Sequence, residues 1–136
     1  MNSIPKYIFL AITVFLSYGI GAWLYQKGSQ VLFNQTIHHS EYRGIVITSF
    51  FLYLMIIVPV IILSIYVINR SSLNTVLKWL LALSISVGAG LIFPFLASGR
   101  QLASPEGQLL LIFFIPSAIV LGIICHILFL NKPIKT

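Results

Sequence analysis

Charge is the scarcest property of this sequence. Lysine, arginine, aspartate and glutamate make up 7% of the 136 residues, whereas hydrophobic residues make up 59%. A typical soluble domain carries about 25% charged residues. A chain this short also has too much surface for its volume to hide so many apolar side chains from water. The low charge content therefore excludes an ordinary soluble domain and indicates that lipid is the solvent of this chain.

The few charges divide the sequence into four long apolar runs. The runs hold 20, 26, 21 and 25 uncharged residues, and they lie between Lys6 and Lys27, Arg43 and Arg70, Lys78 and Arg100, and Glu106 and Lys132. A helix that crosses a bilayer needs roughly 20 apolar residues, and continuous runs do not fit the alternating strands of a membrane β-barrel. We therefore predict an all-α integral membrane protein, an up-down bundle of four transmembrane helices. It forms a single domain over 1–136, with helices at about 7–25, 44–68, 75–97 and 105–130.

Acidic residues are almost absent, which narrows the chemistry. The two acids are Glu41 and Glu106, and both stand at the ends of predicted spans. Ion-coupled transporters usually place an acid inside the membrane, and intramembrane hydrolases need a nucleophile with a base, or a metal cluster. Cys125 is the only cysteine, so no disulfide can form within the chain. We expect a protein that is not an enzyme and needs no metal or other cofactor.

The basic residues predict an orientation. The formal net charge is +6, but the basic residues stand singly at helix ends, so membrane orientation explains them better than nucleic-acid binding does. Four spans place the N-terminus, the 69–78 loop and the C-terminus on one side. That side holds five basic residues and the other holds three: Lys6, Arg70, Lys78, Lys132 and Lys135 against Lys27, Arg43 and Arg100. The positive-inside rule then puts both termini in the cytoplasm, and the small size suggests a bacterial inner (plasma) membrane.

Local signals mark helix ends and a bend. Ser104, Pro105 and Glu106 form a strong helix start, because a capping hydroxyl precedes a proline and an acid. Ser40 and Glu41 resemble it more weakly, so we expect Ser40 to cap the second helix. Pro59 predicts a kink within that helix. The sequence between the first two spans predicts an external loop over 26–43.

Small residues recur four positions apart in three of the spans. This spacing lets helix backbones approach closely in lipid. It serves either packing within the bundle or contact with another helix, and the residues are Ser17 and Gly21, Ser84 and Gly88, Ser86 and Gly90, and Ala118 and Gly122.

Ionisable side chains crowd together once, in HHSEYRG at 38–44. His38, His39 and Glu41 do not form a specific metal motif, so we interpret the segment as the polar start of the second helix, with pH sensing or partner contact as the alternative. His126 lies inside the last span. An ionisable group there is a functional candidate, although a neutral histidine near an interface serves equally well in packing.

These features favour a protein that works by contact. We expect a small non-catalytic membrane interaction protein whose partners are the lipid bilayer and another integral membrane protein or a second copy. It would act as an accessory subunit of a membrane complex or as an immunity-type inhibitor of a pore-forming toxin. The alternative is a self-assembling channel, holin-like pore or uncoupled small-solute carrier, lined by hydroxyl-bearing residues.

Overall fold

The computed structural model describes residues 3–99 and 101–130, and the regular structure within them is entirely helical. Five α-helices and one π-helical turn follow one another: α1 (Ser3–Phe33), α2 (His39–Leu52), η1 (Tyr53–Ile57), α3 (Val58–Arg70), α4 (Thr75–Ala97) and α5 (Pro105–Leu130). Because α2, η1 and α3 are continuous, they form one long helix. Four helices are therefore long and apolar enough to cross a membrane.

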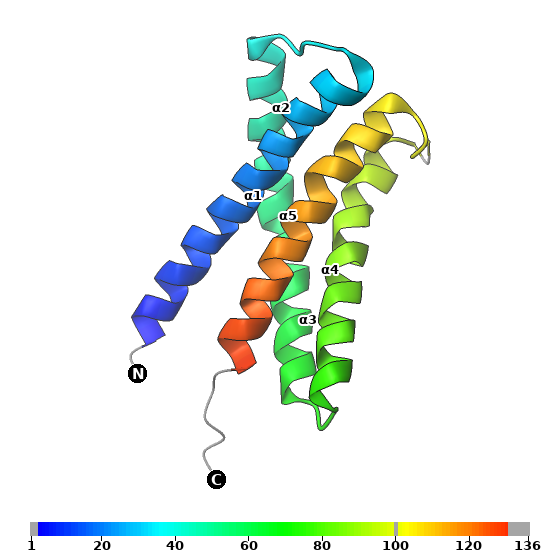
Figure 1. Ribbon diagram of the computed structural model, residues 1–136. Helices are drawn as coiled ribbons and strands as arrows, with labels where there is room; N and C mark the ends of the chain where they lie inside the picture. The colour runs from blue at the N-terminus through cyan, green and yellow to red at the C-terminus, as the bar shows by residue number, and fades with distance from the viewer. Residues whose placement is uncertain (1–2, 100, 131–136) are drawn as a thin grey trace.

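The four long helices run up and down in sequence, so that α1 and α5 begin at opposite ends (Figure 1). The start of α1 and the end of α5 consequently lie at one end of the bundle, together with the α3–α4 turn. The α1–α2 and α4–α5 loops lie at the other end. This arrangement confirms the predicted all-α bundle of four candidate membrane spans.

Apolar side chains cover the outside of the bundle as well as its core. Met55, Val31 and Leu96 are 77%, 76% and 68% exposed. A soluble monomer rarely exposes large contiguous apolar patches, so this surface fits a lipid environment. The core is built around α5, which packs against α1, α3 and α4.

Helix α1 is longer than the sequence predicted. It continues to Phe33 and ends where Asn34 adopts a left-handed conformation at φ 50°. Asparagine tolerates that conformation better than most residues. The predicted loop over 26–43 is therefore wrong for most of its length. Because the segment after Tyr25 contains no proline, its backbone keeps its helical hydrogen bonds beyond the apolar run.

Helix α2 also begins earlier than predicted. His39 is its first residue, and Glu41 lies in the first turn as expected. The expected cap by Ser40 is wrong, because Ser40 lies inside the helix and His38 takes the cap position without a side-chain hydrogen bond. The stronger start signal is confirmed: Ser104 Oγ accepts a hydrogen bond of 3.1 Å from the backbone N–H of Gly107.

The bend expected at Pro59 takes the form of a π-helical turn just before it, η1. Proline has no N–H, and its ring collides with the carbonyl four residues earlier. A wider turn moves that carbonyl away, and such turns occur often at functional sites. Tyr53, the first residue of η1, is completely buried.

Candidate functional site

Three glycines bring helix backbones into direct contact inside the bundle. A Cβ at Gly21 of α1 would collide with Ser117 Oγ and the Phe113 carbonyl of α5. A Cβ at Gly90 of α4 would lie 2.9 Å from the Ile115 Cα, and one at Gly122 of α5 would collide with the Ser86 side chain. These small residues therefore serve packing between α5 and its neighbours.

The other small pair on α4 faces outward. Ser84 and Gly88 are both exposed, and a Cβ built on Gly88 meets nothing within 4 Å. Leu77, Leu80 and Phe95 continue the same outer face and are 43%, 56% and 45% exposed. The sequence predicted close packing for both pairs on this helix. The structure brings Ser86 and Gly90 against α5, whereas Ser84 is exposed and an added Cβ on Gly88 meets none of the described residues within 4 Å.

A group of buried hydroxyls joins three helices beside η1. Tyr53 Oη lies 2.9 Å from Ser17 Oγ of α1 and donates a 3.3 Å hydrogen bond to the Ser117 carbonyl of α5. Ser17 and Ser117 also donate to carbonyls of their own helices. Ala118 is completely buried next to this group. The sequence identified Ser17 as a packing residue but gave no reason to pair it with Tyr53, since that pairing depends on the π-helical turn.

The segment HHSEYRG occupies the first turns of α2. His38, His39 and Glu41 are all exposed. The neighbouring Tyr42 donates a 3.0 Å hydrogen bond to the Ala22 carbonyl and so ties α2 to α1. Among residues 3–99 and 101–130, no three His, Cys, Asp or Glu side chains come together in a way that could hold a metal ion.

His126 is completely buried near the end of α5. Its ring meets the Trp79 ring edge to face, with 4.3 Å between the centroids. Neither ring nitrogen has a hydrogen-bond partner in the described part of the chain, and the same holds for the Asn69 side-chain amide. The sequence left His126 as either a functional candidate or a packing residue. In the structure its ring packs edge to face against Trp79 of α4.

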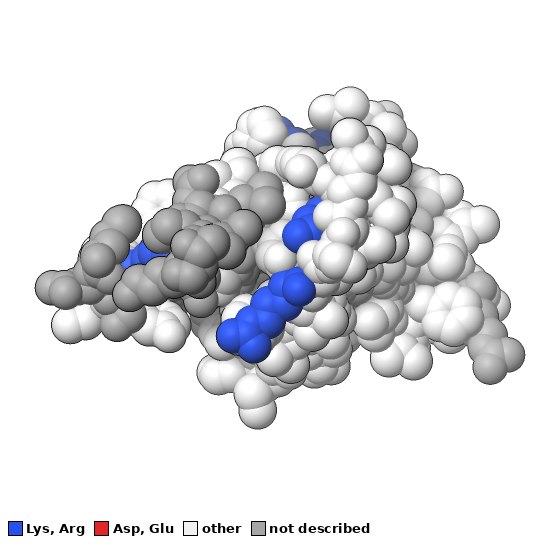
Figure 2. All heavy atoms as spheres, turned by 90° about the horizontal axis from the view of Figure 1, so that it is seen from below, with Lys and Arg blue, Asp and Glu red and all other residues white. Residues whose placement is uncertain are grey.

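Basic side chains lie at the end of the bundle that contains the start of α1 and the end of α5. Figure 2, which views this end, shows lysine and arginine side chains and no acidic one. Lys78 Nζ donates a 3.1 Å hydrogen bond to the Asn69 carbonyl, and the Arg70 guanidinium lies 4.7 Å from the Tyr66 ring centroid. These contacts fix two cations at the α3–α4 turn. Lys132 and Lys135, which the orientation prediction also used, lie outside the described residues.

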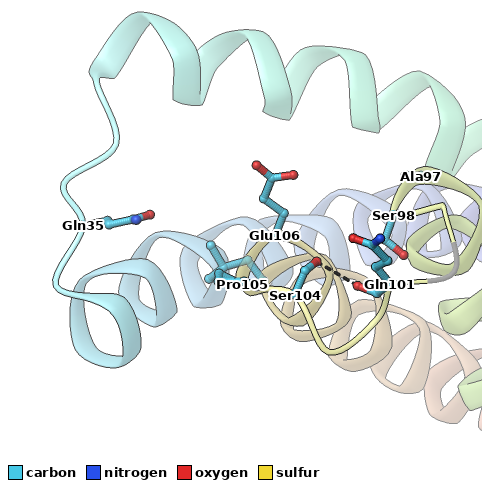
Figure 3. A pocket seen from close by; sticks show the side chains of 8 residues that line it. Gln35, Ala97, Ser98, Gln101, Ser104, Pro105 and Glu106 are labelled. Atoms are coloured by element: carbon cyan, nitrogen blue, oxygen red, sulfur yellow. Dashed lines mark hydrogen bonds between the residues drawn. The ribbon is translucent and has the colours of Figure 1, made fainter.

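A polar pocket opens at the opposite end, between the α1–α2 loop and the α4–α5 loop. Its volume is about 430 Å³. Figure 3 shows Gln35 reaching from one loop toward Glu106 of α5, with Ser98 and Gln101 on the far side. Ser98 Oγ is buried and lacks a hydrogen-bond partner within the described residues. Sequence reasoning identified Glu106 only as a helix-start residue and missed this pocket, because the pocket depends on how two distant loops meet.

An apolar groove of about 320 Å³ adjoins the polar pocket at Ala97, which lines both. The groove lies between α2 and the α4–α5 pair, and its walls include Thr48, Phe93 and Leu110. The pocket is lined mainly by polar groups and the groove mainly by apolar side chains.

Comparisons with known proteins identify no relative of this chain. No protein-family model matches the chain, and searches of curated proteins and of solved structures find no similar protein.

Proposed function

We propose that this chain is a small non-catalytic membrane protein that acts by lateral contact, through the outer face of α4, with a helix of another membrane protein. The partner is either a larger complex, of which the chain is an accessory subunit, or a pore-forming toxin that the chain blocks. The carrying observation is that Ser84 and Gly88 form a close-packing pair on the outer face of α4, with open space around Gly88.

Close packing is the main source of helix association in lipid, because lipid tails are as apolar as leucine. A small pair flanked by large apolar residues forms a shallow groove into which a partner helix fits. The other close-packing glycines of the bundle, Gly21, Gly90 and Gly122, already contact neighbouring helices. Among the described residues no helix approaches Gly88 in this way, so we infer that a partner from outside the chain uses Ser84 and Gly88.

The proposal places the protein in a bacterial inner membrane with both termini in the cytoplasm. Lys6, Arg70 and Lys78 support this orientation, since they lie at the end of the bundle that holds the start of α1 and the end of α5. Basic residues in short loops are retained on the cytoplasmic side.

The test is recovery of partners from native membranes. The tagged chain is extracted in mild detergent, the mass of the particle is measured, and every chain in it is identified. Gly88→Leu should lower recovery of a stoichiometric partner by about tenfold, because the larger side chain prevents close approach. Gly19→Leu is the matched control, since Gly19 of α1 is also exposed with nothing within 4 Å of an added Cβ.

Equal partner recovery by the wild type and Gly88→Leu would refute the α4 contact. A particle made only of this chain would favour the alternative of a self-assembled pore or carrier. In that case, the purified protein should release solute from liposomes.

A further inference from the structure

We propose that Arg70 and Lys78, at the α3–α4 turn, bind the phosphate of one anionic phospholipid, whose acyl chains lie on the exposed apolar side chains beside the turn. This inference goes beyond the contact function and does not depend on it. It holds for either orientation of the chain, because the turn meets one leaflet of the membrane in both.

Two cations are held in place at the last turn of α3. Lys78 Nζ donates a 3.1 Å hydrogen bond to the carbonyl of Asn69, the residue before Arg70. This contact leaves the other N–H groups of the ammonium for an anion. The Arg70 guanidinium lies 4.7 Å from the centroid of the Tyr66 ring. A guanidinium that stacks on a ring keeps the N–H groups at its edge, which bind phosphate well.

Neither acidic side chain of the sequence lies at this end of the bundle. The two acids are Glu41 and Glu106, and they lie in the first turns of α2 and α5, at the opposite end. Residues 131–136, outside the described part of the chain, contain two lysines and no acidic residue. The acidic side chains of this protein are therefore too far away to pair with Arg70 or Lys78, and an external anion is needed to neutralise them.

The start of α4 adds to the positive potential at the turn. A helix carries a partial positive charge at its N-terminus. Helix α4 begins here with Asn74 as its cap and with no acidic residue in its first turn, whereas α2 and α5 each have a glutamate there. Two fixed cations and this helix start together favour a phosphate group.

The surroundings of the two cations select a lipid over a soluble phosphate. Val67, Val76 and Leu77 flank the turn and are 65%, 65% and 43% exposed. Tyr66 contacts Arg70, and Trp79 follows Lys78 in the chain. Tyrosine and tryptophan mark the headgroup level of membrane helices, and basic residues at that level bind the headgroups of anionic lipids. An anionic phospholipid therefore matches both the cations and the apolar surface.

Quenching of Trp79 by brominated lipids in liposomes tests this inference. The chain has two tryptophans, Trp23 and Trp79, so Trp23→Phe leaves the reporter that lies next to Lys78. Phosphatidylglycerol and phosphatidylcholine with identical brominated acyl chains are compared in phosphatidylcholine membranes. We expect phosphatidylglycerol to occupy the site beside Trp79 about twentyfold more readily, because each basic residue near the membrane surface contributes about fivefold. Equal quenching by the two lipids would overturn the proposal.

The variant Trp79→Phe provides the matched reporter, because it leaves only Trp23, which is 57% exposed on α1. Trp23 should show little preference between the two lipids. The preference at Trp79 should weaken in about 1 M salt, where the Debye length falls to about 3 Å. A preference of the same size at Trp23 would show that phosphatidylglycerol gathers around the whole protein, and a site at the turn would be wrong.

Charge variants locate the site. Arg70→Gln and Lys78→Gln should each lower the preference about fivefold, whereas Arg70→Lys should keep most of it, because it keeps the charge. Lys6→Gln is the control. Lys6 belongs to the same end of the bundle, but Figure 1 shows the start of α1 well apart from the α3–α4 turn. An equal loss in Lys6→Gln would mean that the basic end attracts anionic lipid as a whole, which would overturn the assignment to Arg70 and Lys78.

Glycerophosphoglycerol separates the lipid from its free headgroup. Added in excess, it should leave the quenching of Trp79 by brominated phosphatidylglycerol unchanged, because it lacks the acyl chains. Relief of the quenching would show that the turn takes a soluble phosphate, and the proposed lipid would be wrong.

Discussion

Gly122 of α5 and the side chain of Ser86 of α4 lie so close that no Cβ fits between them. A Cβ at Gly122 would collide with Ser86 Oγ and lie 2.9 Å from Ser86 Cβ. The Ser86 hydroxyl turns back to its own helix and donates a 2.7 Å hydrogen bond to the Ala82 carbonyl. The contact therefore depends on shape and not on a hydrogen bond between the helices.

Replacing Gly122 with alanine should destabilise the bundle, and Ser86→Ala should partly restore it. The added methyl group overpacks the contact, which typically costs about 1–3 kcal/mol. Removing Ser86 Oγ takes away the nearest colliding atom but leaves Ser86 Cβ. The free energy of unfolding in detergent, followed by circular dichroism, measures both effects.

Gly90→Ala is the control: its added Cβ meets the backbone of Phe114 and Ile115, so Ser86→Ala should not restore it. Equal stability of Gly122→Ala with and without Ser86→Ala would refute this contact.

Removing the phenolic hydroxyl in Tyr53→Phe should loosen the junction of three helices. The variant loses the contact with Ser17 Oγ and the hydrogen bond to the Ser117 carbonyl. Hydrogen bonds between membrane helices are worth about 0.6–2 kcal/mol each, so the free energy of unfolding should fall by about 1 kcal/mol. Tyr7→Phe is a suitable comparison, because Tyr7 is 70% exposed. An identical loss in both variants would show that the buried hydroxyls contribute nothing specific.

His126→Phe should leave the bundle as stable as the wild type or make it more stable. The imidazole is completely buried, and both nitrogens lack a hydrogen-bond partner in the described residues. A buried polar group without a partner costs about 1–3 kcal/mol. Phenylalanine removes that cost and keeps an aromatic ring against Trp79. A marked loss of stability, measured by thermal unfolding in detergent, would mean that His126 has a binding partner in the folded protein.

Thiol labelling in intact cells tests the orientation. Cys125 is the only cysteine and is completely buried, so the wild type should remain unlabelled. Thr36→Cys and Ser72→Cys place exposed thiols at opposite ends of the bundle. A reagent that cannot cross the inner membrane should label Thr36→Cys and not Ser72→Cys, if both termini lie in the cytoplasm. The reverse pattern would invert the predicted orientation.

Hydrophobicity predicted the four helices but not all of their ends. The apolar run after Lys6 indicates which part of the chain lipid can surround. The end of α1 at Phe33 depends instead on where helical hydrogen bonding stops. Asn34 supplies that stop through its left-handed backbone. The start of α5 was predictable because Ser104 carries the signal in its own side chain.

The sequence also contained every small residue of the helix contacts without showing which ones face the bundle. Ser84 and Ser86 are two positions apart, so they point about 200° apart around α4. One faces α5 and the other faces outward. The choice follows from packing against the neighbouring helices, and so does the placement of Gln35 and Glu106 in the lining of one pocket.

In the π-helical turn before Pro59, the number of residues matters more than the identity of their side chains, because that number sets how α2 is rotated relative to α3. The turn holds one residue more than an α-helical turn, so deleting one residue of 54–56 would restore regular geometry and rotate α2 by about 100° relative to α3. Tyr42 would then point away from the Ala22 carbonyl, and Tyr18 of α1 would lose the Val46 carbonyl that accepts its hydroxyl. The extra residue thus fixes the rotation of α2 about the helix axis relative to α3. It sets the direction in which the upper half of the second membrane helix presents its side chains.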